Sequence, residues 1–156
     1  MIEDPKVAVS LVSVVVGVLL GLAVSELKDW WWRSRRRKAH WRALSAETEL
    51  CREMAETFLH DNVQAPLYRL PTLSYLHSFP VLLADGKPTE QETRAVTEFY
   101  NQVETLNRGL DQTHEARDSV ARLNEEFVRN RLKAESLVAP VSLYARLRGV
   151  LDQRAR

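Results

Sequence analysis

Hydrophobic residues dominate an uncharged run from Val7 to Val24, in which only Ser10, Ser13, Gly17 and Gly21 are not hydrophobic. An α-helix rises about 1.5 Å per residue, so this run covers roughly 27 Å, close to the thickness of the hydrocarbon layer of a bilayer. Extended to Leu27, the run predicts a transmembrane helix over residues 7–27, preceded by a short tail over residues 1–6. A buried core helix and a cleaved signal peptide are less favoured, because core helices carry charges more often and the leader "MIEDPK" is not basic.

Small residues recur at every fourth position of this run, namely Ser13, Gly17, Gly21 and Ser25. In a helix, a step of four residues advances about 400°, so these residues form one gently slanting strip. Small side chains let two helix backbones approach closely in lipid, where hydrophobic attraction between helices is weak. The strip therefore predicts packing of this helix against a second copy or against a partner's membrane helix. The alternative is that glycine and serine are merely tolerated in a membrane helix.

Aromatic and then cationic residues follow the apolar run. Trp30, Trp31 and Trp32 come first, and indole rings favour the headgroup layer of a bilayer. The cationic residues directly after them are Arg33, Arg35, Arg36, Arg37 and Lys38. Positive charge marks the cytoplasmic side of a membrane helix. Residues 28–42 therefore predict a juxtamembrane segment in contact with membrane lipid, with the N-terminus outside and the rest of the chain cytoplasmic.

A nucleic acid is the less favoured partner of these cations. Trp41 could stack on a base beside the segment "RSRRRKAHWR", but a segment held against phospholipid is badly placed to grip a nucleic acid. The formal net charge of the whole chain is only +1, so no long-range field draws the protein toward a polyanion.

Helical spacing continues beyond the basic segment. No glycine or proline interrupts residues 25–65, and Glu47 is among the polar positions of this stretch. The apolar positions that recur at helical spacing are Leu44, Leu50, Cys51, Met54 and Phe58. They predict that one helix continues to about His60.

Prolines punctuate the apolar stretch that follows, "NVQAPLYRLPTLSYLHSFPVLLADGKP". It predicts a short helix from Pro71 to Ala84, broken or bent at Pro80 because proline removes a backbone donor, and then a turn at "DGKP". Its aromatic residues are Tyr68, Tyr75 and Phe79. Core packing is the favoured interpretation of these rings, and a surface or groove for a partner or ligand is the alternative.

A capping box marks the start of the next helix, with Thr89 as its first member and Glu92 as its second. Apolar residues at helical spacing carry this helix to the region of Gly109 to Gln112. A further helix is expected from about His114 to Val138. Residues 43–139 thus predict a helical bundle.

The last predicted element is a short amphipathic helix over residues 140–156. Its apolar side includes Leu143, Tyr144 and Leu147, and its other side is rich in arginine. We expect it to pack on the bundle, to touch the membrane surface or to dock on a partner. The whole pattern predicts an all-α chain in which one N-terminal transmembrane helix continues into a cytoplasmic bundle of about four helices.

Candidate chemistry is sparse in the 156 residues of the chain. Its glycines do not form a phosphate-binding loop, and its single cysteine cannot form a disulfide or a cysteine-based zinc site within one chain. Glu53, Glu56 and His60 share a helix face, but their spacing is not that of a carboxylate-bridged metal bundle. We therefore expect no catalytic residue, no cofactor, no metal and no enzymatic activity.

Two short motifs, "LPTLSYL" over 70–76 and "FYNQVETLN" over 99–107, resemble a loosely defined group of small bacterial single-pass membrane proteins. Proteins of this group have a helical cytoplasmic domain of unknown function, and the resemblance covers residues 43–107. The matching residues are Leu70, Thr72, Ser74, Tyr75, Tyr100 and Val103. The resemblance implies a location in the bacterial inner membrane and adds no catalytic residue.

Together these patterns predict a membrane-anchored scaffold or accessory subunit that assembles through its transmembrane helix and binds a cytoplasmic partner. The alternative is a self-oligomerising membrane effector or sensor of the stress or phage-defence type. A homo-oligomer or a complex with another membrane protein is expected in either case.

Overall fold

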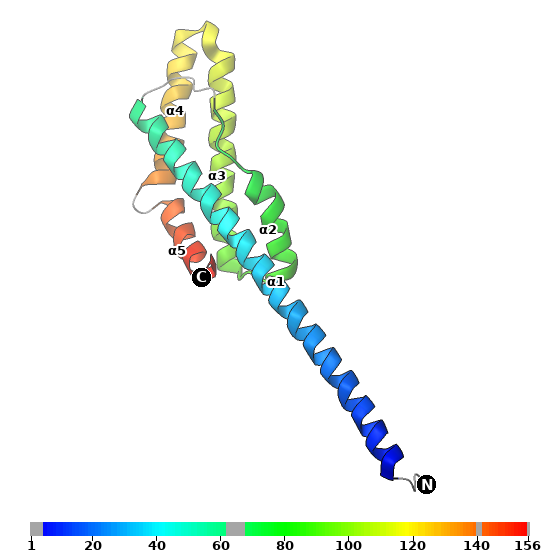
Figure 1. Cartoon of the computed structure of the whole chain (residues 1–156). Helices are drawn as coiled ribbons and strands as arrows, with labels where there is room; N and C mark the ends of the chain where they lie inside the picture. The colour runs from blue at the N-terminus through cyan, green and yellow to red at the C-terminus, as the bar shows by residue number, and fades with distance from the viewer. Residues whose placement is uncertain (1–4, 62–67, 140–141, 156) are drawn as a thin grey trace. The chain divides into compact units, whose positions relative to one another are not determined.

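The computed structural model describes the backbone of residues 5–61, 68–139 and 142–155 (Figure 1). Every element in these residues is helical, so the prediction of an all-α chain is confirmed. The chain divides into two compact units, unit 1 from Met1 to Arg36 and unit 2 from Arg37 to Arg156.

Helix α1 (Pro5–Asp61) contains the described backbone of unit 1 and the first helical segment of unit 2. Its end at Asp61 confirms the prediction of a helix that reaches about His60. In unit 1, every described side chain from Val16 to Trp30 is exposed. Unit 1 thus has no core of its own among the residues that the structure describes.

Helix α2 (Leu73–Asp85) lies close to its predicted bounds. The helix was expected to be broken or bent at Pro80, and the break is absent: this proline lies inside the helix, between the buried Phe79 and Leu82, whose packing holds both halves against the core. The predicted turn follows, and its left-handed residue is Lys87, with a φ of 43°.

Helix α3 (Glu90–Glu115) begins at the predicted capping box, in which Thr89 Oγ1 accepts from the Glu92 backbone and the Glu92 carboxylate accepts from the Thr89 backbone. The end predicted near Gly109 to Gln112 comes too early, because the helix runs to Glu115. Gly109 is buried where a Cβ would meet the side chain of Asn130, so it permits close helix packing instead of ending the helix. The helix continues beyond it with Thr113 buried.

A short 3₁₀ turn, η1 (Ala116–Asp118), separates α3 from α4 (Val120–Val138), and α5 (Leu143–Ala155) follows. The predicted start of a helix near His114 is therefore wrong, because His114 still belongs to α3 and extended backbone at Ser119 precedes α4. Helix α5 packs on α3 and α4 within unit 2.

The core of unit 2 contains side chains from every one of its described α-helices. Its largest buried members include Leu44 and Phe58 of α1, Leu82 of α2, Phe99 and Leu106 of α3, Leu137 of α4, and Leu147 and Leu151 of α5. Leu50, one of the apolar positions at helical spacing, is 47% exposed, whereas its neighbour Cys51 is buried. Trp41 is only 4% exposed, so its ring is not available to stack on a base.

A side-chain amide holds the segment that leads into α2. Asn107 Oδ1 accepts from the Leu70 backbone N–H at 2.8 Å, and Asn107 Nδ2 donates to the Leu70 carbonyl at 2.9 Å. Leu70 is buried and lies outside the helices, so these bonds satisfy backbone groups that would otherwise lack partners. Both residues belong to the two short sequence motifs at 70–76 and 99–107.

Candidate functional site

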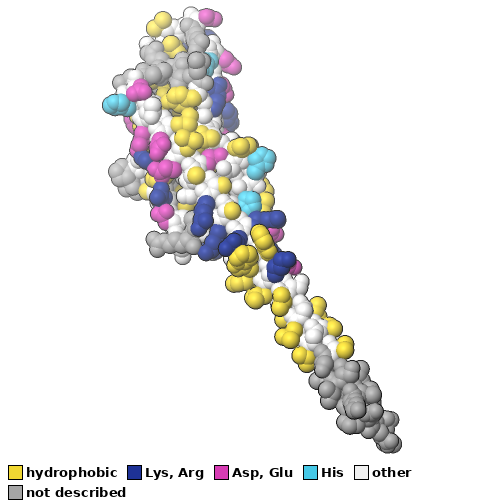
Figure 2. All heavy atoms as spheres, viewed as in Figure 1, with side chains coloured by type: hydrophobic (Ala, Val, Ile, Leu, Met, Phe, Trp, Pro, Cys, Tyr) yellow, Lys and Arg dark blue, Asp and Glu magenta, His cyan; other side chains and the backbone are white. Residues whose placement is uncertain are grey.

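The described part of unit 1 exposes many apolar side chains of α1, and Figure 2 shows those on one face of the helix. Its aliphatic side chains are between 46% and 66% exposed: Val14, Val16, Val18, Leu19, Leu20, Leu22, Val24 and Leu27. The side chains of residues 7–13 and of Val15 lie outside the described residues. Among the residues that are described, no helix has a stretch both long enough and apolar enough to cross a membrane.

The predicted strip of small residues lies on this surface. A Cβ built at Gly17 or at Gly21 would meet no other atom within 4 Å, so both glycines face open space in the isolated chain. Ser25 is also exposed, whereas Ser13 lies among the side chains that are not described. The surface at these two glycines is therefore free for a second helix to approach.

Trp31 is the centre of an aromatic and cationic cluster in unit 1. The ring of Trp31 meets the ring of Trp32 edge to face, with the two ring centroids 5.5 Å apart. The guanidinium carbon of Arg35 lies 3.7 Å from the centroid of the Trp31 ring. Arg33 Nε donates to the backbone carbonyl of Asp29 at 3.3 Å. The structure thus brings together several of the predicted interface residues.

The other predicted interface residues have different surroundings. Trp30 and Arg36 are exposed in unit 1, while Lys38 is exposed and Arg37 is half-buried in unit 2. The interface residues therefore lie on both sides of the boundary between the two units.

The predicted partner or ligand surface is divided among several places in unit 2. Tyr75 stacks on Phe79 and on Tyr100 of α3, with centroids 5.4 Å and 4.3 Å away. Tyr68 donates from its hydroxyl to the backbone carbonyl of Met54 at 3.4 Å. Phe79 is buried, which confirms core packing, the favoured interpretation, for this ring and contradicts the alternative of a partner or ligand surface there.

The large hydrophobic side chains that α2 exposes are leucines rather than aromatic residues. Leu73, Leu76 and Leu83 all lie at the surface of unit 2. Sequence reasoning missed them because an apolar stretch by itself does not show which residues turn outward.

A buried carboxylate, which the sequence pattern had placed on a polar face, positions α2. Glu47 accepts from the backbone N–H groups of Ser74 and Tyr75 at 2.6 Å and 3.0 Å. These groups belong to the first turn of α2, where helix N–H groups have no partner in the helix and attract negative charge. The cap comes from another helix, so local sequence reasoning could not find it.

The α5 members of the predicted surface pack against α1. Leu147 is buried, so it belongs to the core and not to a partner or ligand surface, and Leu143 is half-buried beside that core. Tyr144 donates to the carboxylate of Glu49 at 2.5 Å, and Arg148 donates to the same oxygen at 2.6 Å. Together, these contacts place α5 on the bundle, the first of its three predicted positions.

Glu49 is the charged centre of this contact. The hydroxyl of Tyr144 and then the guanidinium of Arg52 hold its pKa below the ordinary value of 4.5. Burial, and then the Glu49 carboxylate, raise the pKa of Tyr144. Both shifts keep the carboxylate ionised and the phenol protonated, so the group acts as a structural link rather than as an acid or base near neutral pH.

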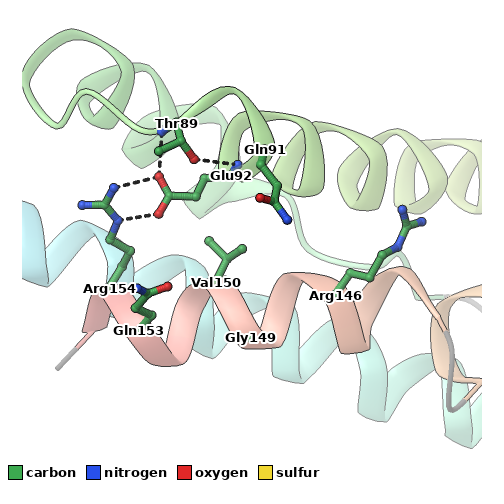
Figure 3. A pocket seen from close by; sticks show the side chains of 8 residues that line it. All are labelled: Thr89, Gln91, Glu92, Arg146, Gly149, Val150, Gln153 and Arg154. Carbon is green, nitrogen blue, oxygen red and sulfur yellow. Dashed lines mark hydrogen bonds and ion pairs between the residues drawn. The ribbon is translucent and has the colours of Figure 1, made fainter.

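A second link joins α5 to the start of α3 and borders a groove of about 710 Å³ (Figure 3). Arg154 makes two hydrogen bonds with Glu92, at 2.6 Å and 2.8 Å. Arg146 lies at the other end of the groove, and Val150 lies between the two arginines. The Glu92 carboxylate is already neutralised by Arg154, so it is not a free base for catalysis.

Unit 2 contains two potential nucleophiles, the thiol of Cys51 and the hydroxyl of Ser78. The Cys51 thiol is buried, donates to the Pro71 carbonyl at 3.2 Å, and has a pKa raised to about 12, chiefly by burial. Ser78 Oγ lies 3.1 Å from His40 Nδ1. In the part of the chain that the structure describes, no cluster of His, Cys, Asp and Glu is arranged to hold a metal ion.

Comparison with known protein families, curated proteins and solved structures finds no match to this chain. The resemblance to small bacterial single-pass membrane proteins therefore stays a prediction. The candidate site with the clearest physical signature is the exposed apolar surface of α1 together with the tryptophans and arginines that follow it.

Proposed function

We propose that this chain is a membrane-anchored scaffold or accessory subunit whose helical bundle holds a partner in the bacterial cytoplasm. The observation that carries the proposal is the exposure of apolar side chains on every side of α1 between Val14 and Leu27. A helix that is apolar all round is normally covered, either by protein or by lipid.

The free energy available from burial of these side chains favours their contact with lipid or protein. Full burial of one Val or Leu side chain contributes roughly 1.5–3 kcal/mol. The eight aliphatic side chains exposed from Val14 to Leu27 together represent on the order of 10 kcal/mol, comparable with the whole stability of a typical domain. This surface is therefore expected to bind lipid or another apolar surface rather than remain in water.

The order of residues supports lipid as the cover. Apolar side chains are followed by Trp30, Trp31 and Trp32, and the arginines come next. This is the order of hydrocarbon, interface and charged headgroups met on leaving a bilayer. In the proposed arrangement, residues 7–27 span the inner membrane, the N-terminus is outside and unit 2 is cytoplasmic.

The small-residue strip supports assembly within the bilayer. Gly17 and Gly21 face open space in the single chain, so a second helix can approach the backbone there. The bundle has its own core and needs no enzymatic chemistry for this role. We propose that the membrane helix assembles the complex while unit 2 binds the cytoplasmic partner.

Cysteine labelling tests the anchor and its orientation. The native thiol of Cys51 is buried, so it gives little background in variants that carry one added cysteine at another position. A cysteine replacing Val18 should stay unlabelled by a membrane-impermeant maleimide until detergent is added. A cysteine replacing the exposed Glu135 should react in inverted vesicles but not in intact spheroplasts. Labelling of the Val18→Cys variant in sealed membranes of both orientations would refute the anchor.

Native mass spectrometry of the gently extracted complex tests the assembly. Extra mass from a different chain supports an accessory subunit, whereas a multiple of 17.9 kDa alone favours the self-oligomerising effector or sensor. The variant Gly17→Ile with Gly21→Ile should lose assembly and remain in the membrane. Its matched control is Leu19→Ile with Ala23→Ile, which places two isoleucines on the opposite side of the helix and should assemble normally.

A further inference from the structure

We infer that the arginines directly after the tryptophans bind the phosphates of anionic phospholipids, and we name Arg33, Arg35 and Arg36 as the principal ligands. This inference rests on the proposed membrane anchor and adds the class of lipid that the anchor prefers. It is carried by the charge balance, angular distribution and ring contacts of these arginines.

The first observation concerns charge. The sequence has no Asp or Glu between Trp30 and Ala46. In unit 2, arginines such as Arg52, Arg148 and Arg154 form ion pairs with carboxylates. None of the ion pairs found among the described residues includes Arg33, Arg35 or Arg36. Their compensating negative charge is therefore expected from outside the chain.

The second observation concerns direction. Residues 33–38 are helical, and a helix turns about 100° per residue. The exposed cationic residues at positions 33, 35, 36 and 38 consequently leave no gap wider than about 140° around the helix axis. A protein or a nucleic acid would contact one side of such a helix, whereas the headgroups of a bilayer surround it. The distribution therefore favours lipid.

The third observation concerns the Trp31–Arg35 pair. The Arg35 guanidinium lies over the ring of Trp31, 3.7 Å from its centroid. Stacking holds the guanidinium plane while its N–H groups remain directed along that plane, where they can bind a phosphate in a bidentate manner. Because Arg35 covers a face of Trp31, that face is not available to stack on a nucleic-acid base.

Tryptophan fluorescence offers a direct test. The full chain is reconstituted into bilayers of phosphatidylcholine and phosphatidylglycerol in which only one of the two lipids has brominated acyl chains. Bromine quenches nearby indoles, and Trp41 gives a constant background because it is buried. We expect quenching at Trp30, Trp31 and Trp32 to be about twofold or more stronger when phosphatidylglycerol is brominated, because one cation near an anionic surface contributes roughly a fivefold preference.

The variant Arg33→Gln with Arg35→Gln and Arg36→Gln should lose this preference and still be quenched. The control variant Arg94→Gln with Arg108→Gln and Arg122→Gln removes the same charge from exposed positions of unit 2 and should keep it. Persistence of the preference in the first variant would overturn the assignment to these arginines. Loss of the preference on addition of RNA would also overturn it, by identifying nucleic-acid phosphate as the stronger ligand.

The same experiment separates this inference from the proposed function. Equal quenching of the unmodified chain by both brominated lipids would refute the preference for anionic lipid and leave the membrane anchor intact. Absence of quenching by either lipid, with the chain recovered outside the floated vesicles, would refute the anchor and the lipid site together.

Discussion

Arg154 donates two hydrogen bonds to the carboxylate of Glu92, which lies 62 residues earlier in the chain. Nε donates to Oε1 at 2.6 Å, and Nη2 donates to Oε2 at 2.8 Å. Glu92 is also the second member of the capping box that begins α3. One carboxylate therefore closes the start of α3 and anchors the end of α5. This shared role makes the docking of α5 and the start of α3 energetically dependent on each other.

Replacement of Arg154 by Gln should lower the free energy of unfolding by about 1–3 kcal/mol, because a nearly buried carboxylate loses its charged donor. The matched control is Arg146→Gln on the same helix. Its partner Glu98 is more exposed, so the expected loss is under about 1 kcal/mol. Urea unfolding of the full chain in detergent, monitored through the loss of the helical circular dichroism signal, measures the free energy of unfolding of both variants. Equal losses would contradict the special role of Glu92.

The stability of unit 2 should fall in acid, partly through Glu92. Arg154, and then the Thr89 backbone, hold the pKa of Glu92 below its ordinary value of 4.5 against the opposing effect of burial. A lowered native pKa means that the unfolded chain binds the proton more readily, so this stabilisation is complete above about pH 4.5 and is lost as the pH falls through the lowered value. Glu92→Gln should flatten this part of the pH dependence of unfolding. The control Glu90→Gln changes an exposed carboxylate at the first residue of α3. This variant should keep the full pH dependence of unfolding.

Two glycines in helices should respond to alanine in opposite ways. At Gly109 a new Cβ would lie 1.9 Å from Asn130 Oδ1, so Gly109→Ala should destabilise by about 1–3 kcal/mol through overpacking between α3 and α4. At Gly149 nothing lies within 4 Å, and Gly149→Ala should stabilise α5 by up to about 1 kcal/mol through helix propensity. Thermal unfolding of the two variants gives the comparison. A stabilised Gly109→Ala protein would show that α3 and α4 pack less closely than the structure indicates.

Cys51 should resist thiol reagents in the folded protein. Its thiol is buried and its pKa is raised to about 12, so both access and thiolate are scarce at pH 8. In urea the same thiol should react with maleimide at the rate of an ordinary cysteine. Leu50→Cys, one residue away at a position that is 47% exposed, should react rapidly without urea. Rapid labelling of native Cys51 would mean that the core opens around it.

Local features of the fold were predictable because their causes lie within a few residues. The capping box of Thr89 and Glu92 sets the start of α3, and the absence of glycine and proline from residues 25–65 carries α1 to Asp61. The order of the apolar run, Trp30 to Trp32 and the arginines is likewise a property of the sequence, and on it the prediction of a membrane anchor depends.

Contacts between distant residues decided the rest. Gly109 was predicted to end a helix, but the approach of Asn130 gives that glycine a packing role. Glu47 was predicted to be a polar position of the first helix. In the structure its carboxylate is buried and accepts hydrogen bonds from backbone N–H groups in the first turn of α2. Phe79 and Leu147 were candidates for a partner or ligand surface, but both side chains are buried in the packed structure.

The sequence by itself determined the helical character of the chain, the start of α3 and the layered order of residues 7–38, because propensity, capping and hydrophobic order act over short distances. Only the tertiary structure decided which carboxylates are neutralised and which apolar residues are buried. Those outcomes depend on side chains that the sequence separates widely, such as Glu92 and Arg154, and that meet only when the helices pack.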